Sequence, residues 1–324
     1  MSLPIALRQA IEAEAGRVPL RELSAAAAEL SAKYRQPSAS QTPFINSEVE
    51  RVAYAATRLP ATYAAARQVF AEVRRLLPDV RMNSLLDLGA GSGAASWAAV
   101  ETFSELQHCT LFEQDAGLMQ LGRTLTRVAE HEALRAADWQ QANLARTHEI
   151  PAHDLIVCSY ALGELEASAA RQLIHHAWLA ANRALIIIEP GTMRGFATVR
   201  AARAELLAAG AHLIAPCPHA QACPMPDNDW CHFAARVERS ALQRRLKAGA
   251  LGYEDEKFSY VAFAKWPVQP VAARVLRHPQ RAPGHTQMQL CTAEGVRQVA
   301  ITKRDKEAWR RVRKVNWGDA WDGA

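Results

Sequence analysis

The sequence lacks two features that would connect it with a membrane or with secretion. Its apolar runs, such as residues 184–188, have the length of a strand and fall far short of a membrane-spanning helix. Its first residues show no basic start, apolar core and cleavage site of a signal peptide. Because 49% of the 324 residues are hydrophobic and 22% are charged, we expect a soluble globular protein of one large or two ordinary domains. We therefore expect a cytoplasmic protein with no membrane partner.

The cysteines lack the C-x2-C spacing that is usual in structural zinc sites. Instead, Cys217, Cys223 and Cys231 form a C-x5-C-x7-C segment among prolines and histidines, and Cys291 lies far downstream. Thiolates are soft ligands that suit zinc or iron–sulfur centres, and in a reducing compartment clustered cysteines more often bind metal than form disulfides. We predict a metal site here and leave zinc and iron–sulfur open. The alternative is a group of buried, inert thiols.

Charge is shared unevenly along the chain. From Arg194 onward there are 21 Lys and Arg against 12 Asp and Glu, whereas the preceding part has 17 against 21. This asymmetry predicts a polyanion-binding C-terminal half, and residues 303–317 interleave cations with tryptophans that suit stacking on unpaired bases. A solvated basic helix is the alternative. We predict one positive, RNA-binding face made of Arg236, Arg239, Arg244, Arg245, Lys247, Lys303, Arg304, Arg310, Arg311, Arg313 and Lys314.

Hydrophobic periodicity divides the chain into three parts. Residues 1–80 form an N-terminal helical region, with helices predicted at 3–15, 20–34, 47–59 and 61–77. Residues 81–265 alternate strands with helices, which predicts an α/β sheet with strands at 84–88, 109–112, 140–144, 154–160, 183–188, 212–215 and 258–264. The cysteine-rich segment, about 216–256, is then an insertion between the last two strands. Residues 266–324 form a small basic C-terminal extension that supplies Cys291.

A glycine-rich turn follows the first predicted strand. Such a turn lets the backbone approach a ligand and aims the next helix N-terminus at it. The G-A-G-S-G pattern at 89–93, preceded by L-L-D-L, resembles the S-adenosylmethionine loop of Rossmann-like methyltransferases more than a G-x-G-x-x-G dinucleotide loop. Glu113 is predicted to accept the ribose hydroxyls, whereas Asp115 is predicted to cap the following helix. The full predicted cofactor set is Asp87, Gly89, Ala90, Gly91, Glu113, Asn143, Tyr160 and Leu162.

Motifs along the chain together resemble one family. They are L-L-D-L-G-A-G-S-G (85–93), S-Y-A-L-G-E-L (159–165), E-P-G-T (189–192), G-A-H-L-I-A-P-C-P-H (210–219), D-W-C-H-F (229–233), G-Y-E-D-E-K-F-S-Y (252–260), K-R-D (303–305) and N-W-G-D (316–319). Over roughly residues 80–320 the chain resembles a bacterial member of the methyltransferase-like family named for a mitochondrial small-ribosomal-subunit protein. The resemblance implies a seven-stranded methyltransferase fold and association with the small ribosomal subunit during assembly or translation. It also implies a [4Fe-4S] cluster held by Cys217, Cys223, Cys231 and Cys291.

The sequence leaves the activity open between two hypotheses. The segment after the fourth predicted strand lacks the D/N-P-P-Y/F motif of enzymes that methylate base nitrogens, and only Tyr160 and Glu164 are candidates for a stacking ring and a base. The first hypothesis, which we favour, is an S-adenosylmethionine-dependent enzyme that methylates ribosomal RNA. The second is a non-catalytic, RNA-binding assembly factor with a structural zinc or iron–sulfur site.

Overall fold

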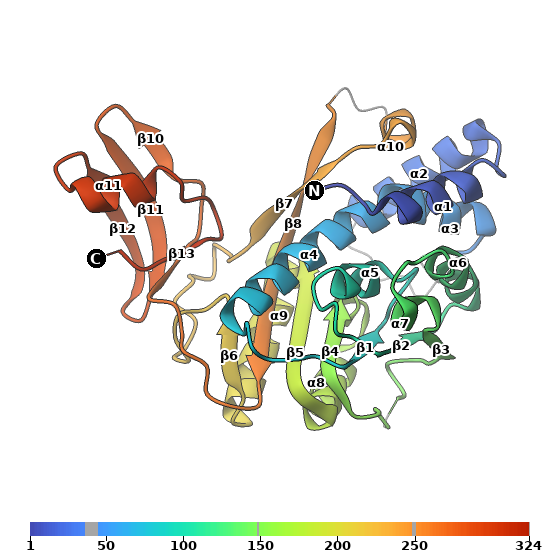
Figure 1. Ribbon diagram of the computed structural model, residues 1–324, viewed down its shortest axis with the longest axis horizontal. Helices are drawn as coiled ribbons and strands as arrows, with labels where there is room; N and C mark the ends of the chain where they lie inside the picture. Colours follow the sequence, from blue (N-terminus) through green and yellow to red (C-terminus); the bar gives the residue numbers. More distant parts are fainter. Residues whose placement is uncertain (36–44, 148, 248–250, 324) are drawn as a thin grey trace.

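The computed structural model of the protein describes residues 1–35, 45–147, 149–247 and 251–323 (Figure 1). Helices precede a central sheet that has further helices on both faces, and a second, smaller sheet lies at the C-terminal end. No helix in these described ranges is both long enough and apolar enough to cross a membrane.

The four predicted N-terminal helices are confirmed. They are α1 (Ile5–Ala15), α2 (Leu20–Arg35), α3 (Glu48–Thr57) and α4 (Leu59–Leu76). Ser47 starts α3 with a capping box, because its hydroxyl accepts the Glu50 N–H at 3.1 Å and the Glu50 carboxylate accepts the Ser47 N–H at 3.2 Å. Helix α4 lies against the central sheet, where Phe70 packs on Phe103 with ring centroids 5.8 Å apart. The helical region and one sheet face therefore share a single hydrophobic core.

The central sheet has the strand order β3-β2-β1-β4-β5-β8-β6, with β7 pairing the outer part of β8. Its strands are β1 (Ser84–Leu88), β2 (His108–Glu113), β3 (Asp138–Gln141), β4 (His153–Ser159), β5 (Ala181–Pro190), β6 (His212–Ala215), β7 (Phe233–Glu238) and β8 (Tyr253–Ala264). The first five are parallel to one another, and β8 runs antiparallel to β5, β6 and β7. This path of seven strands confirms the predicted Rossmann-like methyltransferase fold, and β7 is an additional, eighth strand.

Several predicted strand boundaries shift: the strands predicted at 183–188 and 258–264 are longer, 181–190 and 253–264. The third strand is 138–141 rather than 140–144, because it is an edge strand on which only Trp139 is buried and the apolar signal is weak.

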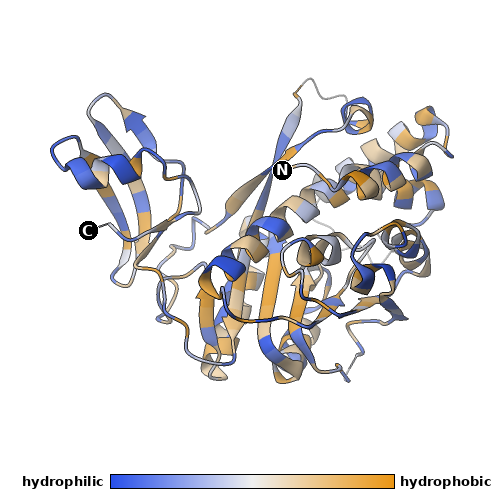
Figure 2. Ribbon diagram, in the orientation of Figure 1, coloured by the Kyte–Doolittle hydropathy of each residue, from blue (hydrophilic) through white to orange (hydrophobic). Residues whose placement is uncertain are grey.

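Helices cover both faces of the central sheet. On one face α4 lies beside α5 (Ala94–Val100), with α6 (Ala116–Thr126) and α7 (Glu132–Arg135) further along. On the other face lie α8 (Ala167–Ala180) and α9 (Met193–Ala208). Because side chains alternate along a strand, Ile186 joins the core under α4 while Leu185 joins the core under α8 and α9. Burial on both faces explains why this strand reads as a continuous apolar run, which is orange in Figure 2.

The C-terminal part forms its own sheet, called here the C-terminal sheet. Its strands are β9 (Ala273–Val275), β10 (Gln280–Ala282), β11 (His285–Thr292), β12 (Gly295–Thr302) and β13 (Ala320–Trp321). Helix α11 (Lys306–Val312) packs on it, with Val275, Leu290, Val312 and Trp321 in a small core. The short helix α10 (Ala241–Leu246) belongs to the insertion and lies against α2 and α3 (Figure 1).

Candidate functional site: a cofactor edge and a cysteine pocket

The glycine loop between β1 and α5 is held in a conformation that needs glycine. Gly89, Gly91 and Gly93 have φ angles of 77°, 56° and 92°. A Cβ on Gly89 would lie 2.6 Å from the Cβ of Ala161, whereas a Cβ on Gly91 would meet no atom within 4 Å. Gly89 therefore packs against the segment after β4, and Gly91 faces open space at the carboxyl edge of the sheet, where open α/β sheets bind ligands.

Glu113 anchors this loop from the end of β2. Its carboxylate is 7% exposed and accepts the N–H groups of Gly91 and Asp115, each at 2.8 Å. Burial raises the pKa of Glu113, although these backbone donors oppose the shift. A carboxylate offers about four lone-pair positions, so Glu113 can accept a further donor beside these backbone groups. Asp115 caps α6 as predicted, because its side chain accepts the Leu118 N–H at 2.6 Å.

Two other predicted cofactor residues make local contacts. Asp87 is 1% exposed and accepts a hydrogen bond from the Ser96 hydroxyl at 2.7 Å, and burial raises its pKa to about 6. This bond ties β1 to α5. The exposed Asn143 uses its side-chain oxygen to accept the Ala145 N–H at 3.0 Å, which shapes the loop after β3.

The segment after β4 carries both candidate catalytic residues. Tyr160 has a φ of 59°, a conformation that costs a residue other than glycine about 1–3 kcal/mol. Its hydroxyl donates to Glu256 at 3.1 Å, and Glu256 also pairs with Arg58 at 3.3 Å. Burial raises the pKa of Tyr160 well above its usual value. Glu164 ends a short 3-10 turn and is exposed.

Sequence reasoning missed Glu189 as a functional residue. It ends β5 and is 1% exposed, and its carboxylate accepts the Leu162 N–H at 3.0 Å. A Cβ on Gly163 would lie 2.9 Å from the same carboxylate, so the turn after β4 is seated directly on Glu189. Burial raises the pKa of Glu189 to about 8. The signal in the sequence was a single acidic residue between an apolar strand and Pro-Gly.

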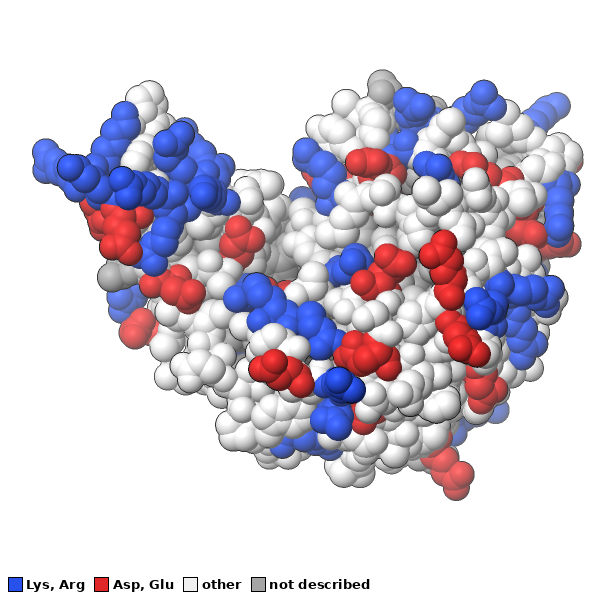
Figure 3. Space-filling view, in the orientation of Figure 1, with Lys and Arg blue, Asp and Glu red and all other residues white. Residues whose placement is uncertain are grey.

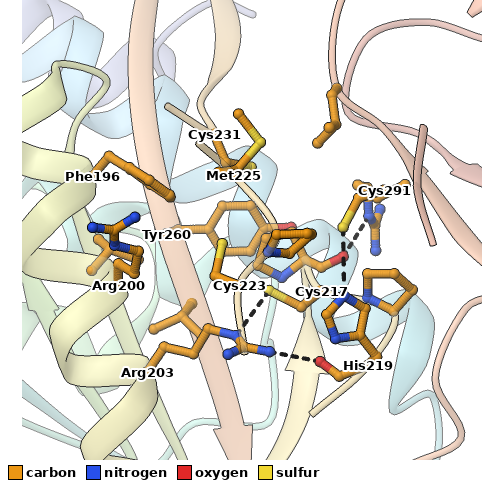
Figure 4. A pocket seen from close by; sticks show the side chains of 17 residues that line it. Phe196, Arg200, Arg203, Cys217, His219, Cys223, Met225, Cys231, Tyr260 and Cys291 are labelled. Carbon is orange, nitrogen blue, oxygen red and sulfur yellow. Dashed lines mark hydrogen bonds between the residues drawn. The ribbon is translucent and has the colours of Figure 1, made fainter. Parts of the chain in front are cut away.

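The four predicted cysteine ligands line one pocket (Figure 4). Cys217 and Cys223 follow β6, Cys231 precedes β7, and Cys291 lies on β11. The pocket has about 560 Å³ of space, counting its open mouth. Burial raises the pKa of Cys291 to about 12, and the neighbouring charges of Cys217 and Cys223 add to the shift. The structure thus brings together four thiols from distant parts of the chain.

Two buried arginines flank these thiols. Arg203 on α9 is 5% exposed; it donates to the Cys217 sulfur at 3.3 Å and to the His219 carbonyl at 2.7 Å. Arg274 on β9 is 1% exposed and donates to the Pro216 carbonyl at 2.8 Å. Four thiolates around zinc or an iron–sulfur cluster carry excess negative charge, which these cations complement. The donor set therefore fits a metal–thiolate centre.

The four cysteine side chains do not converge on one point. Among the residues that the structure describes, no group of three or more His, Cys, Asp or Glu side chains stands close enough to hold a single metal ion. A zinc site needs sulfurs about 2.3 Å from one ion. A polynuclear cluster holds its four cysteines further apart, so it demands less convergence of the thiols than zinc does.

The predicted basic residues fall into two groups. Figure 3 shows cations gathered on the C-terminal sheet, where the exposed residues form what we call the C-terminal basic surface: Lys303, Arg304, Arg310, Arg311, Arg313 and Lys314. The other predicted group lies on β7, on α10 and just after each of them, across a hollow from that surface in Figure 3. There Arg236 pairs with Asp255 at 2.8 Å, and Arg239 and Lys247 share Glu254. Arg244 and Arg245 of that group are exposed on α10. That the two groups act together as one RNA-binding face stays a prediction.

The sheet order, the glycine loop and the acidic anchor on β2 define a protein of the Rossmann-like methyltransferase fold with an added cysteine pocket. The family model described as "Mitochondrial small ribosomal subunit Rsm22" matches residues 48–322. The chain belongs to this family, which confirms the resemblance found in the sequence.

Two curated relatives are longer than this chain. The human "Ribosome assembly protein METTL17, mitochondrial" is 26% identical over 82% of this chain and 61% of its own length. The Schizosaccharomyces pombe "Rsm22-cox11 tandem protein 2, mitochondrial" is 22% identical over 83% of this chain and 42% of its own length. The chain thus spans about three fifths or less of the length of these relatives.

Solved methyltransferase structures are also similar in outline. Magnesium protoporphyrin IX methyltransferase from Synechocystis, with bound S-adenosylmethionine, gives a TM-score of 0.42 at 11% identity, covering 73% of this chain and 91% of that one. The plantazolicin methyltransferase BpumL gives 0.41 at 11% identity, covering 76% and 98%.

Proposed function

We propose that this protein binds S-adenosylmethionine at the carboxyl edge of β1, β2 and β4 and acts on or with the small ribosomal subunit. The glycine loop carries the first part of the proposal, because Gly91 faces open space beside the Glu113 carboxylate. Family membership and the name of the human relative, a ribosome assembly protein, support the second part.

The cofactor site is tested by two glycine-to-alanine variants with similar backbone strain. Gly91 and Gly210 both have positive φ, 56° and 81°, and a Cβ on either would meet no atom within 4 Å. Only the Gly91 methyl would occupy the space proposed for the cofactor. In calorimetry we expect Gly91→Ala to weaken S-adenosylmethionine binding at least tenfold, about 1.4 kcal/mol. Equal affinities of Gly91→Ala and Gly210→Ala for S-adenosylmethionine would show that the cofactor does not bind at this loop.

We propose methyl transfer to small-subunit RNA as the activity. The second candidate, a non-catalytic assembly factor, is favoured by the engagement of the Tyr160 hydroxyl with Glu256, because a hydroxyl held in this way is less free to meet a substrate. An assay distinguishes the two candidates: small subunits from cells that lack this protein are incubated with the purified protein and S-adenosylmethionine that carries a tritiated methyl group. Label in RNA is expected for the enzyme, whereas a protein that binds cofactor yet transfers no label is the assembly factor.

We also propose that Cys217, Cys223, Cys231 and Cys291 hold a [4Fe-4S] cluster, with zinc as the alternative. The four thiols in one pocket and the flanking Arg203 and Arg274 support this. When bound, the cluster would link the insertion to the C-terminal sheet. Protein purified without oxygen should be brown and contain iron and sulfide. Cys291→Ala should lose the iron, while Cys109→Ala, a buried cysteine of β2, should keep it. Colourless protein with one zinc would establish the alternative.

The C-terminal basic surface is the proposed contact for ribosomal RNA. Its cations are exposed, whereas those near α10 are partly neutralised by acidic partners. Each neutralised phosphate adds about 0.7–0.9 to the slope of log affinity against log salt. Arg310→Gln/Arg311→Gln should therefore lower that slope for a ribosomal RNA fragment more than Arg236→Gln/Arg239→Gln does. Equal slopes would count against this surface. The cytoplasmic location stays a prediction.

A further inference from the structure

The cofactor edge and the cysteine pocket meet at one pair of strands. Glu189, the carboxylate under the turn after β4, is the cross-strand partner of Ser259 on β8. The Ser259 hydroxyl donates to the Cys231 carbonyl at 2.8 Å. The Glu189–Ser259 pair therefore connects the two sites. Glu189 shapes the cofactor edge, and Ser259 binds a backbone carbonyl of the cysteine pocket.

Trp230 makes a second and more direct connection. Its indole N–H donates to the Gly191 carbonyl, just after β5, at 2.8 Å. Gly191 is packed directly on β8, because its N–H donates to the Lys257 carbonyl at 2.8 Å and a Cβ there would lie 2.7 Å from the Phe258 nitrogen. The Trp230 ring is itself stacked on His232, with centroids 5.0 Å apart and planes at 20°. Trp230 and His232 are the chain neighbours of Cys231, and the Trp230 N–H bonds the cysteine segment to the segment after β5.

That segment in turn holds the turn after β4. Glu189 accepts the Leu162 N–H at 3.0 Å, and Arg194 donates to the Gly163 carbonyl at 2.8 Å. The same turn touches the glycine loop, since a Cβ on Gly89 would clash with Ala161. A continuous series of hydrogen bonds and close packing therefore leads from Cys231 to the loop proposed to bind the cofactor.

We propose that Trp230 is a positioning residue that couples occupancy of the cysteine pocket to affinity for S-adenosylmethionine. This inference rests on the proposed function. Ligation of Cys223 and Cys231 would immobilise the segment between them, and with it the Trp230 indole, so that the loops after β5 and β4 keep one arrangement. Without the metal centre the segment gains freedom and the cofactor edge loses this support. Linkage makes the effect reciprocal, and such couplings are typically about 5–150-fold.

Calorimetry on metal-loaded and chelator-stripped protein tests this. For wild type we expect stripping to weaken S-adenosylmethionine binding about tenfold. Trp230→Phe keeps an aromatic ring for His232 but has no N–H for Gly191. It should bind the metal normally, bind the cofactor more weakly when loaded, and show little further loss on stripping. Trp309→Phe, on α11 in the C-terminal sheet, is the matched control and should behave as wild type.

The outcomes distinguish failure of the coupling from failure of the proposed function. Suppose that metal and cofactor both bind, but stripping the metal changes S-adenosylmethionine affinity equally in wild type and Trp230→Phe. The coupling is then wrong while the proposed function stands. If wild type binds no metal or no cofactor, the proposed function fails and the coupling fails with it. Should stripping unfold the chain, the reciprocal measurement decides. Saturating S-adenosylmethionine should slow metal release to a chelator about tenfold in wild type, and not in Trp230→Phe.

Discussion

Replacement of Arg274 by methionine tests what attaches the C-terminal sheet to the rest of the molecule. The Arg274 side chain is fully buried and meets three separate segments. Its guanidinium pairs with Glu72 of α4 at 2.6 Å, and donates to the carbonyls of Pro216 at 2.8 Å and Gly318 at 2.9 Å. Methionine keeps most of the side-chain length and removes the charge together with all three contacts.

The expected loss in the free energy of unfolding follows from burial. Removing one partner of a buried ion pair costs about 3–5 kcal/mol, because the other charge stays behind. Here Glu72 keeps Arg75, which donates to it at 2.8 and 2.9 Å, so we expect the lower end, about 3 kcal/mol. The control pair, Arg236 with Asp255, is 59% and 40% exposed, so solvent screens it and Arg236→Met should cost far less stability.

Urea unfolding and limited proteolysis measure the two consequences. Arg274→Met should lower the urea midpoint well below that of Arg236→Met, and the first cuts should fall in the C-terminal sheet. A double variant, Glu72→Gln/Arg274→Met, should recover part of the loss, because it leaves no buried unpaired charge. The reasoning is refuted if Arg274→Met is no less stable than Arg236→Met. A double variant no better than the single one would show that the ion pair is not the source.

Three further predictions concern other parts of the chain. Arg51 holds the pKa of Asp115 below its usual 3.8. Their pair therefore stabilises the fold above that pH, and this stability is lost as the pH falls through the folded-state pKa. Arg51→Met should weaken this acid dependence of the urea midpoint. Gly89→Ala places a Cβ 2.6 Å from that of Ala161 and should lower the stability by about 1–3 kcal/mol in thermal unfolding, and an unchanged melting temperature would contradict this packing. Trp317→Phe removes an indole N–H that donates to a carbonyl of the cysteine segment at 2.9 Å, so proteolysis of the C-terminal sheet should be faster than in wild type.

Much of this protein was predictable because the signals lie within a few residues of each other. The apolar run at 184–188 indicated a buried strand, since a parallel strand is covered on both faces. Three glycines in five residues indicated the loop that now has three positive φ angles, and Asp115 directly before a helix indicated its cap. The clustered cysteines indicated that their thiols lie together. In each case local geometry or local chemistry restricts which residues can occupy the position.

Tertiary structure alone decided which distant groups meet. Composition counts charges but does not place them, so only the structure shows that the predicted basic residues fall into one group around α10 and another on the C-terminal sheet. Arg274 read as one more cation, yet folding buries it beside Glu72, which lies about two hundred positions earlier. The bond from Trp230 to Gly191 likewise joins segments that no pattern connects. Such contacts depend on how strands and helices pack across the whole chain, and a sequence window carries no record of that packing.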